Sequence, residues 1–224
     1  MILAAGRGER MRPLTDHTPK SLLEVNGNSL ISMIIISLSR AGITELVINL
    51  AHLGEKIAGA LGDGSALGVR ITYSRETEAL ETAGGIAYAL PLLGDQPFIA
   101  VNADVYSDYD FAALVLAARR LRATGPLAHL VLVDNPPQHP HGDFALENDH
   151  VQRDGISKCT FSGMGAYHPA FFAGVTRGTR VRLADLLIAA MPAGHVTGEH
   201  YRGRWHDIGT PERLAAVDRA ARGG

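Results

Sequence analysis

The sequence is poor in cysteine, in excess charge and in long hydrophobic runs. Its one cysteine, Cys159, has no second cysteine with which to form an internal disulfide, which is typical of a protein in a reducing compartment. The 21 lysines and arginines nearly balance the 23 aspartates and glutamates, and the formal net charge is −2. This balance excludes a protein-wide field that would hold nucleic acid or an anionic membrane. Any anion site must therefore be local.

No segment has the length of a membrane span. The longest apolar run, residues 30–38, contains two serines and is followed closely by Arg40, so it is too short to cross a bilayer. No charged stretch precedes an apolar one at the N-terminus, and no secretory signal is predicted. We expect a soluble, cytoplasmic protein without nucleic-acid or membrane partners, either a monomer or a small homo-oligomer. Because the first apolar run begins at Met1, we also expect a few residues upstream in the natural chain.

Strand-like and helix-like segments alternate over the first 134 residues. Apolar runs predict strands at 1–5, 45–51, 69–74, 97–104 and 128–134, and the segments between them predict helices at 29–41, 54–61, 82–93 and 111–123. This alternation favours a mostly parallel sheet with helices on both faces. Ligands of such sheets bind beyond the carboxyl ends of the strands. The loops after Ala5, Ser74, Val101 and Asp134 are therefore expected to share one edge.

Residues 135–224 have a different pattern. "NPPQHPHGDFALEND" is rich in turn residues, and short strand-like segments follow it. Helices are predicted at 182–191 and after Thr210, where Pro211 takes the first helical position. No repeat, low-complexity tract or linker divides the chain. We expect one domain over residues 1–224.

The loop after the first strand, "GRGERMRPLT", combines glycines with basic residues. Gly6 and Gly8 allow the backbone to approach a ligand closely and to adopt a positive φ. Arg10 and, further on, Lys20 add positive charge. The loop matches neither the dinucleotide fingerprint nor a Walker loop, because no G-K-[ST] follows. Taken alone, it is compatible with a plain turn as well as with a cradle for phosphates.

An acidic residue ends the predicted strand at 97–104. A carboxylate at the end of a buried strand, as in Asp104, can hold Mg²⁺, which prefers hard oxygen ligands and bridges to substrate phosphates. The alternative is that Asp104 caps a turn or a helix, and Asp108 and Asp110 fit such turn and cap roles. The ten histidines show no spacing typical of a metal site.

Three of these segments resemble motifs of the sugar-1-phosphate nucleotidyltransferases. "LAAGRGERMRPLT" followed by "TPKSLL" is similar to the opening motif of that family, in which the loop surrounds a nucleoside triphosphate. "VNAD" is similar to its N-x-D motif, and "WHDIGT" to its W-x-D-[IV]-G-T motif. The resemblance implies catalytic roles for Arg10, Lys20 and Asp104, and a Mg²⁺ ion held by Asp104 and Asp207. His206 fills a variable position of the last motif, and we expect a structural role for it.

The resemblance also implies the residues around each substrate. The nucleotide is expected at Leu3, Ala4, Ala5, Gly6, Gly8, Glu9, Arg10, Lys20, Thr82, Gly84, Gly85 and Asn102, and the sugar at Asn102, Gly142, Ser162 and Gly163. Glycines 84 and 85 begin a helix, where exposed backbone amides would admit a base or a phosphate. The backbone amide of Gly142 is expected to reach a sugar hydroxyl. The E-K-P segment of the family is missing, and Lys158 and Arg153 are candidates to replace its lysine.

The fold that the resemblance implies is α/β and Rossmann-like, similar to the GT-A fold. A mostly parallel sheet lies between helices and carries a small antiparallel elaboration on the sugar side. Within one domain, residues 1–134 would form the nucleotide-binding half, and residues 135–224 the half with the sugar site and the second metal ligand.

The implied reaction joins a sugar 1-phosphate to a nucleoside triphosphate and releases pyrophosphate. "LETAGG" and "GEHYRGRWHDIGT" resemble the N-acetylmuramate-1-phosphate uridylyltransferases of cell-wall recycling, which favours UTP and N-acetylmuramic acid 1-phosphate as substrates. Glu81 stands where the family often has glycine, so the base stays open. The alternatives are GTP with mannose 1-phosphate, and UTP or dTTP with glucose 1-phosphate. A non-catalytic nucleotide sensor is a further alternative.

Overall fold

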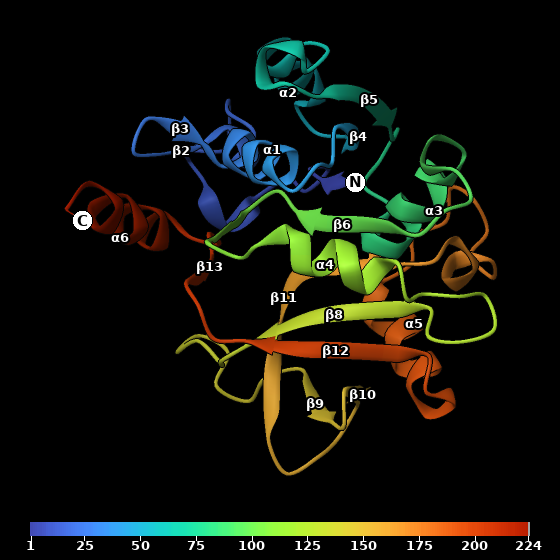
Figure 1. Ribbon diagram of the computed structural model, residues 1–224. Coiled ribbons are helices and arrows are strands. Elements are labelled where there is room, and N and C mark those ends of the chain that lie inside the picture. The colour runs from blue at the N-terminus through green and yellow to red at the C-terminus, as the bar shows by residue number, and fades with distance from the viewer. Residues whose placement is uncertain (224) are drawn as a thin grey trace. The chain divides into compact units, whose positions relative to one another are not determined.

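The computed structural model describes residues 1–223, which divide into two compact units (Figure 1). Unit 1 consists of residues 1–79, 102–111 and 204–223, and unit 2 of residues 80–101 and 112–203. The units do not coincide with the predicted halves 1–134 and 135–224, because the chain passes from one unit to the other several times. A change in composition along the sequence does not tell which segments pack together.

Unit 1 contains three parallel strands. β1 (Ile2–Leu3) pairs with β4 (Glu45–Leu50), and β4 pairs with β5 (Arg70–Arg75), both in parallel. Ile2 lies opposite Ile48, and Leu3 opposite Asn49. Because the three strands run in one direction, their carboxyl ends lie at one edge of the sheet. The predicted parallel pairing is confirmed for this unit.

Capped helices connect and follow these strands. α1 (Leu30–Arg40) begins after Ser29, whose side chain accepts a hydrogen bond from the Ser32 amide, and α2 (Gly54–Leu61) follows β4. α6 (Pro211–Arg222) begins after Thr210, whose side chain accepts one from the Arg213 amide. The hairpin of β2 (Glu24–Val25) and β3 (Asn28–Ser29) precedes α1. A buried cluster joins these elements and consists of Met11, Val25, Leu30, Ile208 and Val217.

Unit 2 contains a mixed sheet. Its strands are β6 (Phe98–Asn102), β8 (Ala128–Val133), β9 (Phe144–Glu147), β10 (His150–Gln152), β11 (Lys158–Tyr167) and β12 (Val196–Tyr201). β11 runs antiparallel to both β6 and β8, whereas β8 and β12 are parallel. β9 and β10 form an antiparallel hairpin that pairs with β11 and β12. This hairpin is the small antiparallel elaboration expected after residue 134.

Three helices accompany the sheet of unit 2. α3 (Glu81–Leu93) packs against α5 (Leu183–Ala190) (Figure 1), and α4 (Phe111–Ala118) follows β7 (Val105–Ser107) in the chain. α4 ends before the predicted boundary at residue 123. Turns follow Ala118, and there the guanidinium of Arg122 donates to the carbonyl oxygens of Arg119 and Leu121. Among residues 1–223, no helix has the length and apolar character needed to cross a membrane.

Candidate functional site

The two predicted metal ligands, Asp104 and Asp207, come together in a short antiparallel ladder of unit 1. β7 (Val105–Ser107) pairs with β13 (Trp205–Asp207), and Asp207 lies opposite Val105. The amide of Ile208 donates a hydrogen bond of 3.1 Å to the carbonyl oxygen of Asp104. Two aspartates that are distant in sequence are therefore neighbours on adjacent backbone segments. Asp104 lies in the turn between β6 and β7 and not in a strand as predicted.

Each of the two carboxylates has one basic partner. Lys20 Nζ forms an ion pair with Asp104 Oδ2, and Arg213 Nη1 donates to Asp207 Oδ2 at 2.6 Å. The Asp104 and Asp207 side chains are 28% and 32% exposed. Oδ1 of each carboxylate accepts no hydrogen bond from residues 1–223. One oxygen of each aspartate is therefore left for a ligand.

These two carboxylates suit a cation that also takes ligands from a substrate. Mg²⁺ is commonly held by one or two carboxylates together with substrate phosphates. Within residues 1–223, no group of three or more histidine, cysteine, aspartate or glutamate side chains is placed to hold a metal ion. The two aspartates thus supply hard oxygen ligands, but too few to complete the coordination of a metal ion. This fits a metal that is bound together with a phosphorylated ligand.

Gly209 makes room for the Arg213–Asp207 pair. A Cβ at this position would lie 2.5 Å from Arg213 Nη2 and 3.2 Å from Asp207 Oδ1. Arg213 Nη1 also donates to the Asp207 carbonyl oxygen at 3.0 Å, so it holds both the backbone and the side chain of Asp207. Sequence reasoning missed Arg213. The signal that could have revealed it is a basic residue in the first turn of a helix that begins directly after "DIGT".

The two glycines of the first loop differ in whether the surrounding protein requires a residue without a side chain. Gly8 has a φ of +67°, and a Cβ there would lie 3.1 Å from both Lys20 Cβ and Thr15 Cγ2. Its carbonyl oxygen accepts a hydrogen bond of 2.8 Å from the Thr15 hydroxyl. Gly6 is exposed, and a Cβ there would meet no atom within 4 Å. The fold therefore requires glycine at position 8, whereas no atom of residues 1–223 requires it at position 6.

Internal hydrogen bonds fix the backbone just before this loop. The Leu3 carbonyl oxygen accepts from the Ala103 amide at 3.0 Å, and the Ala4 amide donates to Asn49 Oδ1 at 2.8 Å. Asn49 Nδ2 in turn donates to Glu76 Oε1 at 2.7 Å. Leu3 and Ala4 are predicted to contact the nucleotide, but the Leu3 carbonyl oxygen and the Ala4 amide are already hydrogen-bonded within the protein. Sequence reasoning missed Asn49 and Glu76, although a lone asparagine in an apolar strand is a signal.

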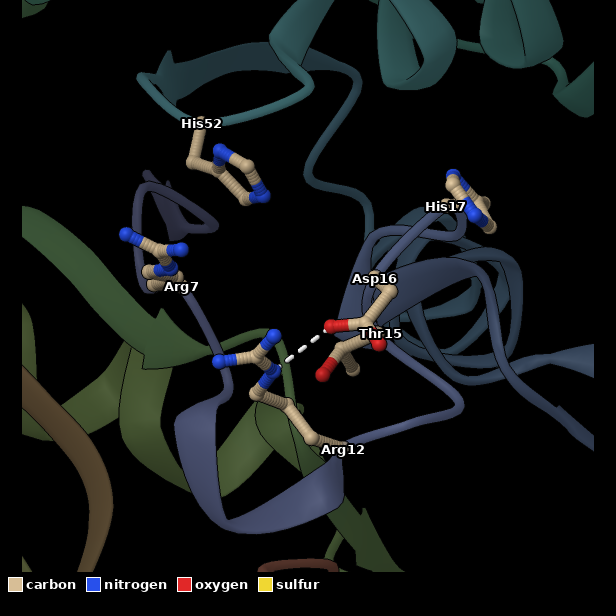
Figure 2. Close-up of a pocket in the computed structure, with 6 residues that line it drawn as sticks. All are labelled: Arg7, Arg12, Thr15, Asp16, His17 and His52. Carbon is tan, nitrogen blue, oxygen red and sulfur yellow. Dashed lines mark hydrogen bonds and ion pairs between the residues drawn. The ribbon is translucent and has the colours of Figure 1, made fainter.

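A cavity of about 340 Å³ lies in unit 1 beside the glycine loop (Figure 2). It is lined by Arg7, Arg12, Thr15, Asp16, His17 and His52. Arg12 Nε donates to Asp16 Oδ1 at 2.6 Å, the ion pair drawn as a dashed line in Figure 2. Arg10 and Lys20 do not line this cavity. Arg10 and Glu9 are exposed, and the Arg10 guanidinium forms no ion pair or hydrogen bond with residues 1–223.

In unit 2, the predicted exposure of the glycine pair at the start of α3 is wrong. Gly84 and Gly85 are buried, and the Gly84 amide donates to the Val181 carbonyl oxygen at 3.1 Å. A Cβ at Gly84 would lie 2.3 Å from the Thr179 carbonyl oxygen. The close packing of α3 against this segment therefore requires the glycine. A nucleotide contact at Gly84, Gly85 and half-buried Thr82 stays a prediction.

The predicted sugar residues of unit 2 are also held by internal contacts. The Gly142 amide, which was expected to reach a sugar hydroxyl, donates to the His139 carbonyl oxygen at 3.3 Å. The hydroxyl of buried Ser162 donates to the Val131 carbonyl oxygen at 2.6 Å. Gly163 lies in the irregular part of β11 and has a φ of +79°. Asn102, the last residue of β6, belongs to unit 1, is half-buried and stays a predicted contact of nucleotide and sugar.

The basic residues of unit 2 divide into paired and unpaired ones. Lys158 and Arg153, the two predicted replacements for the family's lysine, both face Asp154, at 2.9 and 3.9 Å. Arg202 follows β12, is exposed, and forms no ion pair or hydrogen bond with residues 1–223. Sequence reasoning did not single it out.

The strand register places Arg202 beside Asp134 and Cys159. Tyr201 and Thr160 both lie opposite Val133, so the next residue on each side lies near Asp134. Burial and Asp134 raise the pKa of the Cys159 thiol, and Arg202 opposes this shift. His200 Nε2 lies 2.8 Å from Asp134 Oδ1. Asp134 therefore already has a partner, and the Arg202 guanidinium is left for a ligand.

Comparison with known proteins gives consistent results. Residues 1–153 match the family described as "Nucleotidyl transferase". The chain is 53% identical over 218 residues to the N-acetylmuramate alpha-1-phosphate uridylyltransferase of Neisseria meningitidis serogroup B, covering 96% of this chain and 94% of that protein. It is 33% identical over 233 residues to the protein of the same name from Caulobacter vibrioides, covering 99% and 96%.

A solved structure has the same fold. It is a Bacillus anthracis protein described as a glucose-1-phosphate thymidylyltransferase, with a TM-score of 0.87 over 99% of this chain and 94% of that one. The sequences are 22% identical, so this likeness concerns the fold alone. The α/β fold predicted from the sequence is confirmed.

Proposed function

The chain belongs to the nucleotidyl transferase family, and on this premise we propose that it transfers a uridylyl group from UTP to N-acetylmuramic acid 1-phosphate. The products are the UDP-sugar and pyrophosphate. The observation that carries this proposal is the 53% identity to the meningococcal uridylyltransferase over nearly the full length of both chains. The paired aspartates of unit 1 support the transfer chemistry independently.

The proposed step is an in-line displacement. A phosphate oxygen of the sugar 1-phosphate attacks the α-phosphorus of UTP, a new P–O bond forms, and the bond to the β-phosphate oxygen breaks. The electron pair leaves with pyrophosphate. The attacking phosphate is already ionised at neutral pH, so no general base is needed. Because two anions must meet, positioning and charge neutralisation supply most of the catalysis.

Residues of unit 1 have defined roles in this proposal. Asp104 and Asp207 would hold Mg²⁺ through their carboxylate oxygens, and the ion would neutralise charge at the α-phosphate. Arg10, which has no partner among residues 1–223, would bind the departing phosphates. Gly6 would let a phosphate approach the backbone, since its open side meets no protein atom within 4 Å.

Lys20 would pair either with the Asp104 carboxylate or with a phosphate of the nucleotide. In the structure its ammonium group pairs with the Asp104 carboxylate. When Asp104 takes a metal, the ammonium group of Lys20 would transfer to a phosphate oxygen of the nucleotide. The flexible stem of lysine permits this movement, whereas the planar guanidinium of Arg213 stays on Asp207.

Arg202 is our candidate for recognising the sugar. N-acetylmuramic acid carries a lactyl carboxylate that N-acetylglucosamine lacks. Burying such a carboxylate requires a hydrogen-bonding cation. Arg202 supplies an unpaired guanidinium in the unit that contains the predicted sugar residues, whereas Lys158 and Arg153 already face Asp154.

A substrate matrix tests the proposed function. UTP, GTP, dTTP, ATP and CTP are each combined with N-acetylmuramic acid, N-acetylglucosamine, mannose and glucose 1-phosphates, and pyrophosphate release is measured with and without Mg²⁺. We expect the highest kcat/KM for UTP with N-acetylmuramic acid 1-phosphate. A preference for GTP with mannose 1-phosphate would replace this proposal by a guanylyltransferase, and no release from any pair would indicate a nucleotide sensor. A cytoplasmic location and the oligomeric state stay predictions.

A further inference from the structure

The loop that follows β8 is held by one side chain, the carboxamide of Asn135. Asn135 Nδ2 donates to the Lys158 carbonyl oxygen at 2.8 Å and to the Pro140 carbonyl oxygen at 3.3 Å. Asn135 Oδ1 accepts from the Thr160 hydroxyl at 2.9 Å. Because carbonyl oxygens only accept hydrogen bonds, the two of them fix which end of the carboxamide carries the nitrogen. Both donors and the oxygen of this side chain are therefore used within unit 2.

This loop lies at the edge of the unit 2 sheet where a ligand is expected. β8 and β12 are parallel, so their carboxyl ends lie at one edge, and antiparallel β11 begins there with Lys158 (Figure 1). Residues 134–143 connect β8 to β9 at this edge. Ligands of α/β sheets bind outside the carboxyl ends of the parallel strands. The loop is therefore placed to contact a substrate.

The hydrogen bond to Pro140 also sets the direction of a backbone donor. The Pro140 carbonyl group and the His141 amide belong to one planar trans peptide group, so they point in opposite directions. The His141 amide therefore points away from Asn135, and it forms no hydrogen bond with residues 1–223. The Gly142 amide donates to the His139 carbonyl oxygen at 3.3 Å, which is longer than is usual for such a bond. One free donor and one weakly held donor thus follow each other in the loop.

Asn135 also packs closely against the residue that carries the second donor. A Cβ at Gly142 would lie 2.6 Å from Asn135 Oδ1 and 2.9 Å from the Cys159 carbonyl oxygen. The φ of Gly142 is +61°, so glycine is favoured there for its conformation as well. Prolines at positions 136, 137 and 140 restrict the rest of the loop. The backbone of residues 140–142 is therefore held in one position by Asn135.

We propose that Asn135 is the positioning residue of the sugar site, because it orients the backbone amides of His141 and Gly142 toward oxygens of the sugar 1-phosphate. This proposal rests on the proposed function for the identity of the sugar. The amides would contact groups that N-acetylmuramic acid and N-acetylglucosamine share, whereas the lactyl carboxylate is assigned to Arg202. Donors that are already in place bind more tightly, since the loop need not be ordered on binding. Loss of Asn135 should therefore weaken sugar binding and leave UTP binding unchanged.

Steady-state kinetics test this role. In Asn135→Asp a carboxylate takes the shape of the carboxamide but faces two carbonyl oxygens, so both donated hydrogen bonds are lost. We expect KM for N-acetylmuramic acid 1-phosphate at saturating UTP to rise about tenfold or more, while KM for UTP and kcat change less than about twofold. An unchanged KM for the sugar phosphate, or an equal rise in both KM values, would overturn the proposal.

A control and a milder variant separate positioning from stability. Gln96→Glu introduces the same charge at an exposed residue that precedes β6, at the opposite edge of the sheet, and should keep both KM values. Thr160→Val removes the hydrogen bond to Asn135 Oδ1 and should raise KM for the sugar phosphate about threefold. It decides the case if Asn135→Asp does not fold. A lower unfolding temperature of Thr160→Val with an unchanged KM would show that this contact serves the fold only, against the proposal.

The choice of sugar distinguishes Asn135 from Arg202. KM for N-acetylglucosamine 1-phosphate should rise in Asn135→Asp by the same factor as KM for N-acetylmuramic acid 1-phosphate, because the two sugars share the groups that the amides would contact. Arg202→Gln, by contrast, should affect only the sugar with the lactyl group. A loss in Asn135→Asp that is confined to N-acetylmuramic acid 1-phosphate would contradict the assigned contacts.

Failure of the proposed function gives a different result. If the wild-type protein releases no pyrophosphate from any substrate pair, the proposed transfer is wrong. N-acetylmuramic acid 1-phosphate is then titrated into the wild type and into Asn135→Asp by calorimetry. Binding to Asn135→Asp that is weaker by about tenfold supports the role of Asn135. Equal affinities, or no binding to the wild type, would overturn it.

Discussion

In unit 1 the two predicted metal ligands each pair with a basic side chain, whereas in unit 2 several predicted substrate residues donate hydrogen bonds to backbone carbonyl oxygens. Lys20 and Arg213 reach Asp104 and Asp207. By contrast, Gly84, Gly142 and Ser162 use their polar groups on the backbone of their own unit. The comparison teaches that the ion pairs of unit 1 can exchange partners when a ligand binds, and that unit 2 offers mainly shape together with the unpaired guanidinium of Arg202.

The largest effect is expected from the two aspartates of unit 1. Asp104→Asn and Asp207→Asn should each lower kcat for pyrophosphate release at least about a hundredfold, because loss of one preorganised charge costs roughly 2.7–4 kcal/mol of barrier. Circular dichroism should show an intact fold. Asp95→Asn, at an exposed loop carboxylate, is the control and should stay active. Near-normal turnover in a folded Asp104→Asn protein would remove Asp104 from the site.

The second effect concerns the base that orients Asp207. Arg213→Gln should raise the Mg²⁺ concentration needed for half-maximal activity by about 10- to 100-fold, as is typical when a group that orients a metal ligand is lost. At saturating Mg²⁺ the activity should largely return. Arg219→Gln, on the exposed side of α6, is the matched control. A fall in kcat with an unchanged Mg²⁺ dependence would show that Arg213 supports the fold only.

The third effect tests the unpaired cation of unit 2. Arg202→Gln should lower kcat/KM for N-acetylmuramic acid 1-phosphate on the order of tenfold, because a charge-assisted hydrogen bond to the lactyl carboxylate is lost. The smaller activity with N-acetylglucosamine 1-phosphate should be unchanged. Arg119→Gln removes another exposed arginine of unit 2 as a control. Equal losses with both sugars would contradict a carboxylate contact.

The smallest effect separates the two glycines of the first loop. Gly8→Ala should lower the free energy of unfolding by about 1–2 kcal/mol, because alanine is strained in the left-handed region. Gly6→Ala should leave stability unchanged and raise KM for UTP a few-fold, since its Cβ would project toward the ligand. Chemical denaturation and initial rates measure the two quantities. If Gly6→Ala unfolds more easily and keeps its KM for UTP, Gly6 serves the fold.

The sequence predicts much of unit 1 because its signals are local. A strand, a glycine loop and an aspartate after a strand can be recognised from neighbouring residues, and the motif resemblance adds Asp207. The partners of these residues could not be predicted in the same way. Arg213 meets Asp207 only because β13 leads directly into α6, and Asn49 meets Ala4 only across the β1–β4 pair.

In unit 2 the sequence signals are ambiguous for a physical reason. Glycine at a helix start can serve a ligand or a close backbone contact, and both uses require the missing Cβ. At Gly84 the close backbone contact is with the Thr179 carbonyl oxygen, far along the chain, and local sequence does not reveal it. The place of β11 between β6 and β8 likewise depends on long-range pairing that no local pattern encodes.

The central claim is that one divalent cation is shared by Asp104 and Asp207, and a double-mutant cycle on pyrophosphate release tests it most directly. If both carboxylates bind the same ion, Asp104→Asn with Asp207→Asn should lose little more activity than either single variant. If the losses of the two single variants multiply in the double variant, the aspartates act independently and the shared site does not exist.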